Sequence, residues 1–364
     1  MKNKINKYIS KLSKRHLISI VIILLGLATY FSINVFKKEN FDHLETLALM
    51  RQEEKPVFAQ MRESLPELLK KGGVTGALNL AADAFKKEDI TMYECHTFSH
   101  LLGHHSPLSD EENLRVIMDF GPEFCEGGFK HGLESQIVLS EVNFKERLHR
   151  FCDVLIQNNL GGCFHGAGHT FMRQALDALT AVKLCDELVQ TYTHSITDCY
   201  TGIFSEYTNL AGGVDGETGL EFPDGPAILL KNPPLDICSS LPDHMQLACA
   251  LELNGLGISE QSKPEDIDRK LRECVAGKHR FELQKACVQS VAAVGAQHEL
   301  PKTKEMKVLP FALTLSPEFR ASYIVGAATE MKQFLKNGVN KNWQVFCNGF
   351  KTTEDKTLCE SILK

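Results

Sequence analysis

The sequence predicts an all-α protein of stacked helical hairpins, arranged as an α/α superhelix or a partly closed toroid. It also predicts about five disulfides within the hairpins and an N-terminal transmembrane helix. Segments that begin with cysteine recur about every 36 residues, and most have a second cysteine 11 to 14 residues upstream. Apolar residues over 39–71 recur at roughly helical spacing. One twenty-residue stretch near the N-terminus carries no charge.

The uncharged stretch, Leu17–Phe36, is long enough to span a bilayer as a helix. The basic segment 1–16 precedes it and is expected to remain in the cytoplasm. A cleaved signal peptide is the alternative, but the run is long for one and no small-residue cleavage site follows it. We therefore expect a single-pass membrane protein with a membrane-proximal helix over 39–71. A helical-repeat domain over 74–364 would lie outside the cytoplasm, in the periplasm or at the cell surface.

The charge of the chain argues against nucleic acid as a partner. Residues 1–38 contain eight Lys or Arg and no acid, so the remainder has 32 basic and 46 acidic residues. Such a body offers no basic stripe to phosphates. It suits the attraction of cations, although most of its carboxylates are expected to be solvated surface. The expected partners are the membrane, a metal ion, and a protein or peptide.

The twelve cysteines are interpreted as disulfides, because an even count outside the cytoplasm favours pairing. Two antiparallel helices joined by a short loop bring such positions to the Cα separation of about 5–6 Å that a disulfide needs. The spacing predicts the bridges Cys152–Cys163, Cys185–Cys199, Cys238–Cys249, Cys274–Cys287 and Cys347–Cys359. Buried free thiols are the alternative. Cys95 and Cys125 have no upstream partner; they either bridge each other, which we favour, or one of them binds metal.

A segment rich in Gly, Pro and acids interrupts the repeat over 211–236. It is expected to be a long surface loop. Its acidic residues Asp215, Glu217 and Asp224 offer calcium ligands, but their spacing does not match an EF-hand loop.

Histidines concentrate between residues 96 and 169, on three consecutive repeats. The stretch Gly162–Met172 is expected to hold Cys163, His165 and His169 on one helix. His165 and His169 are four apart and share a face, while Cys163 lies about 200° around the helix from His165. His131 stands six residues after its cysteine, as His169 does. The imidazoles are therefore expected on the inner side of each helix and the disulfides on the outer side.

Imidazoles from three adjacent helices, with carboxylates beside them, are typical of a transition-metal site. We predict that iron, copper or zinc is bound by histidines, with carboxylates as ligands or as supports of the ligands. The predicted residues are His96, His100, His131, His165, His169, Glu134 and Glu206. Five histidines exceed what one tetrahedral zinc needs, so two ions, or one ion with spare acid–base histidines, would suit them. The alternative is a group of core or surface histidines bonded to neighbouring backbone.

Two resemblances accompany these patterns. Cysteine-paired helices with this period, over roughly 74–364, resemble the cysteine-rich secreted relatives of tetratricopeptide-type repeats, which implies a stacked-hairpin fold. His131-Gly132 and the Cys-Phe-His-Gly of Cys163–Gly166 are similar to the Cys/His-Gly zinc motifs of lanthionine cyclases, which are α/α toroids. The companion motifs of those enzymes are missing, so no activity is carried over.

Two functions are compatible with the sequence. The first is a metal-dependent enzyme, an oxidoreductase or a hydrolase, or a metal-binding protein without catalysis. The second is a repeat scaffold that binds a protein or peptide on its concave face. The chain contains no Gly-rich phosphate loop, no Gly-x-Ser-x-Gly and no His-Glu-x-x-His motif. Because the cysteines are expected in bridges, a serine or cysteine nucleophile has no support.

Overall fold

The structure is a computed structural model, and its described residues are 55–140, 143–158, 160, 162–188, 196–216, 228, 230, 232–258, 262–276, 278–302, 308–337 and 343–364. The chain divides into two compact units, Met1–Ala48 and Leu49–Lys364. The predicted cytoplasmic tail and transmembrane helix, and residues 39–54 of the predicted membrane-proximal helix, lie outside the described residues. Within the described ranges, no helix is both long and apolar enough to cross a membrane.

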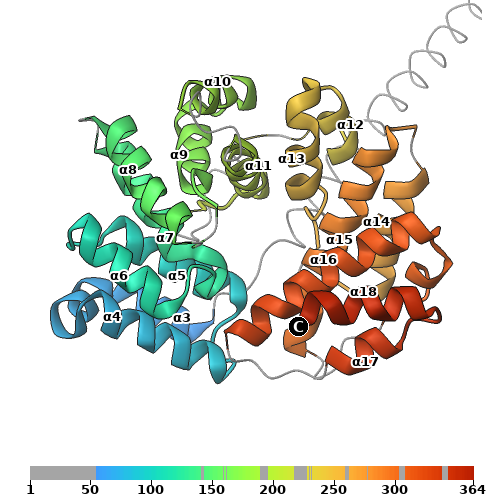
Figure 1. Cartoon of the computed structure of the whole chain (residues 1–364), viewed down its shortest axis with the longest axis horizontal. Helices are drawn as coiled ribbons and strands as arrows, with labels where there is room; N and C mark the ends of the chain where they lie inside the picture. The colour runs from blue at the N-terminus through green and yellow to red at the C-terminus, as the bar shows by residue number, and fades with distance from the viewer. Residues whose placement is uncertain are drawn as a thin grey trace, which may run out of the picture. The chain divides into compact units, whose positions relative to one another are not determined.

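The second unit is helical, and none of its described residues forms a strand. Eight helices pack one against the next in chain order as an inner row (Figure 1). The inner helices are α5 (Met92–His104), α7 (Gly128–Leu139), α9 (His165–Ala175), α11 (Ile196–Gly212), α13 (Asp243–Leu253), α15 (Phe281–Lys302), α16 (Pro317–Lys336) and α18 (Thr353–Leu363). The other helices are α3 (Pro56–Glu63), α4 (Leu65–Lys86), α6 (Asp110–Phe120), α8 (Phe144–Gln157), α10 (Ala178–Leu188), α12 (Pro234–Ser239), α14 (Pro264–Ala276) and α17 (Trp343–Asn348), with short 3₁₀ turns η1 (Phe124–Gly127) and η2 (Ala312–Thr314).

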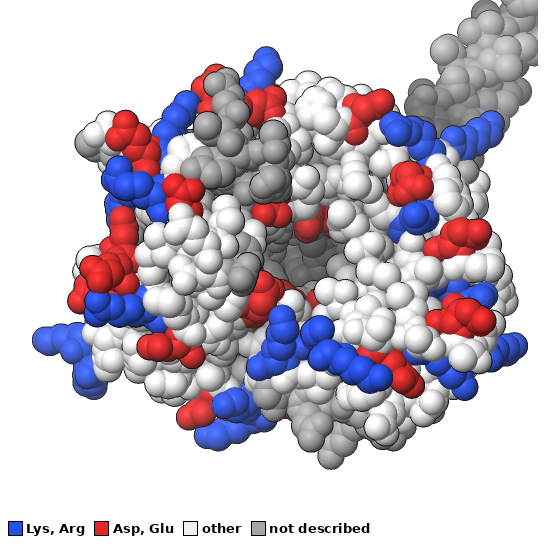
Figure 2. Space-filling view, in the orientation of Figure 1, with Lys and Arg blue, Asp and Glu red and all other residues white. Residues whose placement is uncertain are grey.

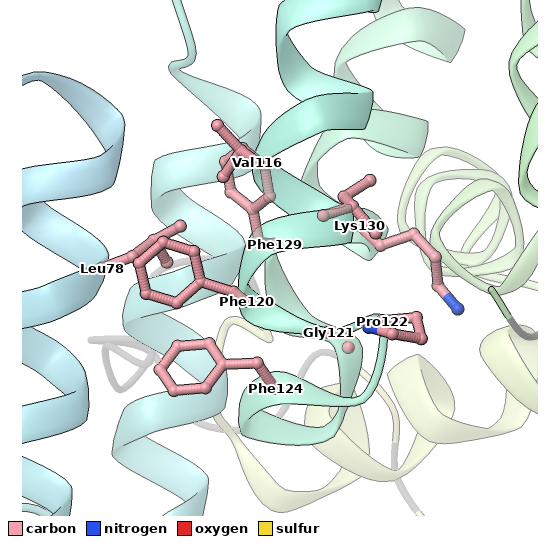
Figure 3. A pocket seen from close by; sticks show the side chains of 10 residues that line it. Leu78, Val116, Phe120, Gly121, Pro122, Phe124, Phe129 and Lys130 are labelled. Carbon is pink, nitrogen blue, oxygen red and sulfur yellow. The ribbon is translucent and has the colours of Figure 1, made fainter.

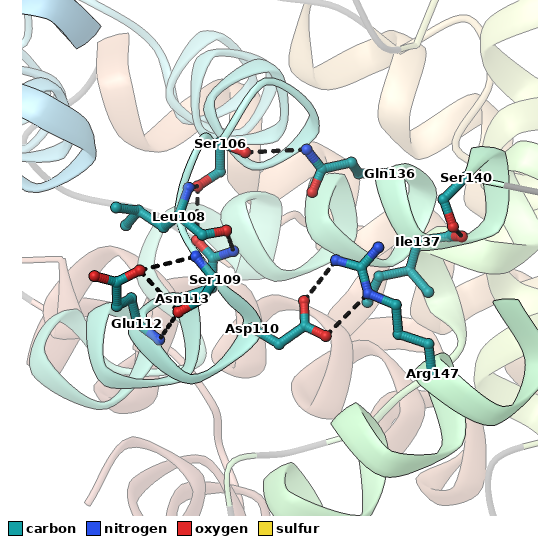
Figure 4. Close-up of polar contacts among 10 residues, drawn as sticks. All are labelled: Ser106, Leu108, Ser109, Asp110, Glu112, Asn113, Gln136, Ile137, Ser140 and Arg147. Carbon is teal, nitrogen blue, oxygen red and sulfur yellow. Dashed lines mark hydrogen bonds and ion pairs between the residues drawn. The ribbon is translucent and has the colours of Figure 1, made fainter. Parts of the chain in front are cut away.

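Local sequence signals set where several helices begin. Thr91 starts α5 with a capping box, and Ser109 with Glu112 starts α6 in the same way (Figure 4). Arg147 of α8 binds both carboxylate oxygens of Asp110 at 2.9 and 2.6 Å, which ties α8 to the start of α6 (Figure 4). These contacts position α6 and α8, two of the helices outside the inner row.

All twelve cysteines form disulfides, with Cα–Cα separations of 5.4 to 6.0 Å. The five predicted hairpin bridges are confirmed, and each joins an outer helix to the inner helix that follows it or to the residues leading into that helix. The sixth bridge, Cys95–Cys125, joins α5 to η1. Neither the free-thiol alternative nor a cysteine metal ligand is therefore compatible with the fold.

Glycines let the first inner helices approach one another at backbone distance. A Cβ atom on any of four glycines would collide with a histidine carbonyl oxygen of the preceding helix, and this explains why glycine is needed there. The facing pairs are Gly128 with His96, Gly132 with His100, Gly166 with His131, and Gly202 with His165. The same close approach that requires glycine brings the histidines of neighbouring helices together.

The prediction that Cys163 shares a helix with the histidines is wrong. Helix α9 begins at His165, and Phe164 before it has a left-handed φ of 75°. Cys125 likewise lies in η1 with a φ of 46°, before α7 begins at Gly128. The glycine-rich sequence around both cysteines has low helix propensity, so a turn replaces the first helical residues. The helical-wheel angle between cysteine and histidine therefore does not apply to these two repeats.

The inner row returns to its start within the second unit. Helix α16 contacts η1, where the Cys125 N–H donates to Asn337 Oδ1 at 2.9 Å. Gln333 Nε2 of α16 also donates to Glu123 Oε2 at 3.2 Å. The face shown in Figure 2 is hollowed at its centre, and Asp and Glu side chains lie around the hollow.

Candidate metal centre

The five predicted histidines come together in the structure as a closed loop of neighbouring imidazoles. Ring centroids lie 5.5 Å apart for His96–His131, 4.5 Å for His131–His165, 4.9 Å for His165–His169, 5.8 Å for His169–His100 and 6.1 Å for His100–His96. Helix α5 supplies two rings, α7 one and α9 two. The helical spacing of four places each pair on one face. The name histidine cluster is used below for these five residues.

In three of the rings, the Nδ1 atom lies within hydrogen-bond distance of an oxygen that can accept from it. His96 Nδ1 lies 3.0 Å from the Cys125 carbonyl oxygen, and His169 Nδ1 lies 3.0 Å from Glu206 Oε2. His165 Nδ1 lies 3.1 Å from Thr201 Oγ1. A carbonyl or carboxylate oxygen can only accept, so Nδ1 of His96 and of His169 carries the hydrogen.

The direction of the bond between His165 and Thr201 follows from the other partner of the Thr201 hydroxyl. Its own hydrogen goes to the Asp198 carbonyl oxygen at 2.9 Å, so its oxygen accepts from His165 Nδ1. In all three rings Nδ1 therefore donates, and Nε2 is the nitrogen left to bind a metal when it carries no proton. Metal-binding histidines typically donate their other nitrogen to a carboxylate, carbonyl or similar group in this way.

The remaining ring nitrogens of the cluster include several buried atoms without a hydrogen-bond partner. His100 is 1% exposed, and neither of its nitrogens has a partner among the described residues. The same holds for Nδ1 of His131 and Nε2 of His169. Buried polar atoms are nearly always satisfied in folded proteins, so these nitrogens need partners that the described residues do not supply.

Burial lowers the pKa of four imidazoles of the cluster and so keeps them neutral. Desolvation, with the nearby His169 adding to it, lowers the pKa of His96 to about 4. Desolvation likewise lowers the pKa of His100, His131 and His165 well below the usual value, with neighbouring imidazoles contributing. A metal ligand must be the neutral imidazole, so these rings are in the required state at neutral pH.

The spacing of the rings suits a shared ion, although their orientations do not converge. Two imidazoles bound to one metal at about 2.0–2.1 Å have ring centres roughly 4.5–5.5 Å apart. The neighbouring rings of the cluster span 4.5 to 6.1 Å. As the side chains lie, no group of three or more His, Cys, Asp or Glu in the described part of the chain forms a metal site. Binding therefore requires rings to rotate, and His100 has no hydrogen bond to oppose this.

The two predicted carboxylates have different positions. Glu206 of α11 bonds His169; burial alone would raise the pKa of Glu206, but the hydrogen bond and charge of His169, with the charge of Arg173, hold it below its usual value. Glu134 instead accepts the Gly166 N–H at 2.7 Å, at the N-terminus of α9. Burial raises the pKa of Glu134 to about 7. Glu134 thus supports the helix that carries two of the histidines.

Several supporting residues were missed from sequence. Thr201 follows Cys199 by two residues, the same offset that separates His165 from Cys163, so the repeat register was a usable signal for it. Arg173 stands four residues after His169, one turn along the same face. The Cys125 carbonyl could not be found in this way, because backbone groups leave no sequence signature.

A small pocket elsewhere in the described part does not compete as a site. It lies beside α6, η1 and α7 and is lined mainly by apolar side chains such as Leu78, Val116 and Phe129 (Figure 3). Lys130 borders it, but its Nζ donates to the Gly162 carbonyl oxygen at 2.9 Å.

Comparisons with protein-family models, with curated proteins and with solved structures found no match to this chain. They do not confirm the resemblance to tetratricopeptide-type repeats or to lanthionine cyclases.

Proposed function

We propose that this chain binds one or two transition-metal ions, iron, copper or zinc, at the histidine cluster. The observation that carries the proposal is that Nδ1 of His96, of His165 and of His169 each bonds an acceptor, which leaves Nε2 of each ring to bind a metal. Imidazole nitrogen is a preferred ligand of these metals. Glu206 is assigned to the support of His169, and Glu134 to the support of α9.

The surroundings favour a function outside the cytoplasm. Six disulfides suit an oxidising compartment. The apolar stretch Leu17–Phe36 would anchor the chain in the membrane, with the helical unit on the periplasmic or outer side. The contact between α16 and η1 favours the toroid over an open superhelix.

Two classes of activity suit such a site. A bound ion with an open position would supply Lewis-acid or redox chemistry, as in a hydrolase or an oxidoreductase. His100, the most buried ring of the cluster, would then hold or move a proton if it is not itself a ligand. A metal carrier or sensor without catalysis needs only the ligands.

Metal analysis of the purified full-length protein tests the proposal. After reconstitution with Zn(II), Cu(II) or Fe(II) in turn, at least one of these metals should remain bound at one or two ions per chain after gel filtration. The double variant His165→Ala/His169→Ala should lose that metal. His244→Ala is the matched control, because His244 is exposed and contacts Tyr200 outside the cluster.

Absence of bound metal in the wild type with all three ions would overturn the proposal and favour the non-catalytic scaffold. Equal metal content in the double variant would place the ion elsewhere on the chain.

A further inference from the structure

The carboxylate of Glu206 is enclosed on all sides by described groups. Glu206 is 0% exposed, and its Oε2 receives His169 Nδ1 at 3.0 Å and Asn209 Nδ2 at 3.4 Å. Its Oε1 receives Nε and Nη2 of Arg173, both at 3.4 Å. One carboxylate thus joins a candidate metal ligand to a guanidinium group.

The chain that follows α11 closes over this carboxylate. Arg173 also pairs with Asp215, which lies three residues beyond the end of α11. The turn is held by the Val214 N–H, which donates to the Asn209 carbonyl oxygen at 2.9 Å. Residues Gly213–Gly216 are called the strap below.

Gly216 lies directly against the carboxylate. A Cβ atom at this position would collide with Glu206 Oε2 and Asn209 Nδ2. Glu206 Oε2 is the oxygen that bonds His169, so a side chain at position 216 would displace the acceptor of that hydrogen bond. The strap and Arg173 therefore hold the two oxygens of Glu206 from different directions.

We propose that the strap and Arg173 are positioning elements of the metal centre, which lock Glu206 onto His169 and thereby set the metal affinity. This inference rests on the proposed metal-binding function. The acceptor behind a histidine ligand fixes the ring orientation and raises its basicity, and its loss typically weakens metal binding about 10- to 100-fold. Arg173 bonds Glu206 and Asp215, and its charge also lowers the pKa of His100; its proposed positioning role runs through Glu206.

The test is a Zn(II) titration of the full-length protein in competition with a chromophoric chelator. Gly216→Ala and Arg173→Gln should each raise the Kd for Zn(II) by about 10- to 100-fold without changing the stoichiometry. Arg173→Lys, which keeps the charge, should recover part of the loss. Gly76→Ala is the control, because a Cβ there meets nothing within 4 Å, and its Kd should equal that of the wild type.

The visible spectrum of bound Co(II) gives a second readout, which a general loss of stability would not change. In Gly216→Ala and Arg173→Gln the visible d–d bands of bound Co(II) should shift, because the His169 ring loses its fixed orientation. Melting curves of the metal-free proteins show whether each variant has folded. If Gly216→Ala has not folded, Arg173→Gln remains as the independent variant.

The outcomes separate the two proposals. Wild-type Zn(II) affinity and Co(II) spectra in both folded variants would overturn the role of the strap and leave metal binding intact. Absence of Zn(II) and Co(II) binding in the wild type, together with the absence of bound copper and iron, would overturn the metal centre and this inference with it.

Discussion

At the scale of single residues, the candidate site depends on which nitrogen of each imidazole carries the proton. His96, His165 and His169 are each fixed by a different acceptor: a backbone carbonyl, a hydroxyl and a carboxylate. Their Nε2 atoms are therefore the ring nitrogens left to bind a metal.

Replacement of Thr201 by valine should weaken metal binding about 10-fold, because His165 Nδ1–H loses its acceptor while the side-chain shape is kept. The Kd for Zn(II), measured by chelator competition, checks this. Thr208→Val is the matched control on α11, since the Thr208 hydroxyl bonds only the Phe204 carbonyl oxygen at 2.9 Å. Equal Kd values for the two variants would show that the Thr201 hydroxyl does not support His165.

Part of this residue-scale description could be predicted from sequence. The spacing of four within His96–His100 and within His165–His169 predicted shared faces, and the repeat register aligned His131 with His169. The structure brings all five rings into one loop of neighbours. The acceptors behind the rings could not be predicted, because they come from other helices and in one case from the backbone.

At the scale of helices, glycine controls how closely the histidine-bearing elements approach. Gly132 and Gly166 each face a histidine carbonyl oxygen on the preceding helix with no room for a Cβ atom. Backbone cannot move aside as a flexible side chain can. A methyl group at either position must push the two helices apart.

We expect Gly166→Ala to lower the free energy of unfolding by about 1–3 kcal/mol, the usual cost of overpacking. The same change at Gly76 should be neutral or stabilise by up to about 1 kcal/mol, because alanine favours helix and its Cβ meets no neighbour. Urea denaturation with the disulfides intact provides the comparison. A Gly166→Ala protein as stable as Gly76→Ala would contradict the close helix approach.

Sequence predicted the pairing of helices better than it predicted their ends. Cysteine spacing was sufficient for the hairpin bridges, because loop length and Cα separation are linked by simple geometry. The starts of α7 and α9 were placed too early, since Cys125 and Phe164 adopt left-handed backbone conformations. Such conformations are uncommon outside glycine, and periodicity gives no warning of them.

At the scale of the whole helical unit, half-buried acids on the later helices oppose the effect of the cluster histidines on the pH dependence of stability. Burial, with the nearby Glu126 adding to it, raises the pKa of Glu252 to about 7. Burial and Glu126 likewise raise the pKa of Glu330 well above its usual value. A raised carboxyl pKa stabilises the fold fully below the unfolded value, and this stabilisation is lost as pH rises through the folded value.

Glu252→Gln should therefore remove a destabilisation that grows as pH rises from about 4.5 to about 7 and is complete above about pH 7. The melting temperature of Glu252→Gln minus that of the wild type should be several degrees larger at pH 8 than at pH 5. The exposed Glu146→Gln provides the control. The raised pKa of Glu252 would be contradicted if this difference were the same at pH 5 and at pH 8.

The measurement that tests the central claim most directly is X-ray absorption at the K edge of the metal in protein reconstituted with Zn(II). The histidine cluster predicts at least three imidazole nitrogens at about 2.0–2.1 Å and no sulfur ligand, because the twelve cysteines are paired. The imidazole signal should fall when His96, His165 and His169 are replaced by alanine. A shell of oxygen alone, a sulfur shell, or a spectrum unchanged by those replacements would contradict the account.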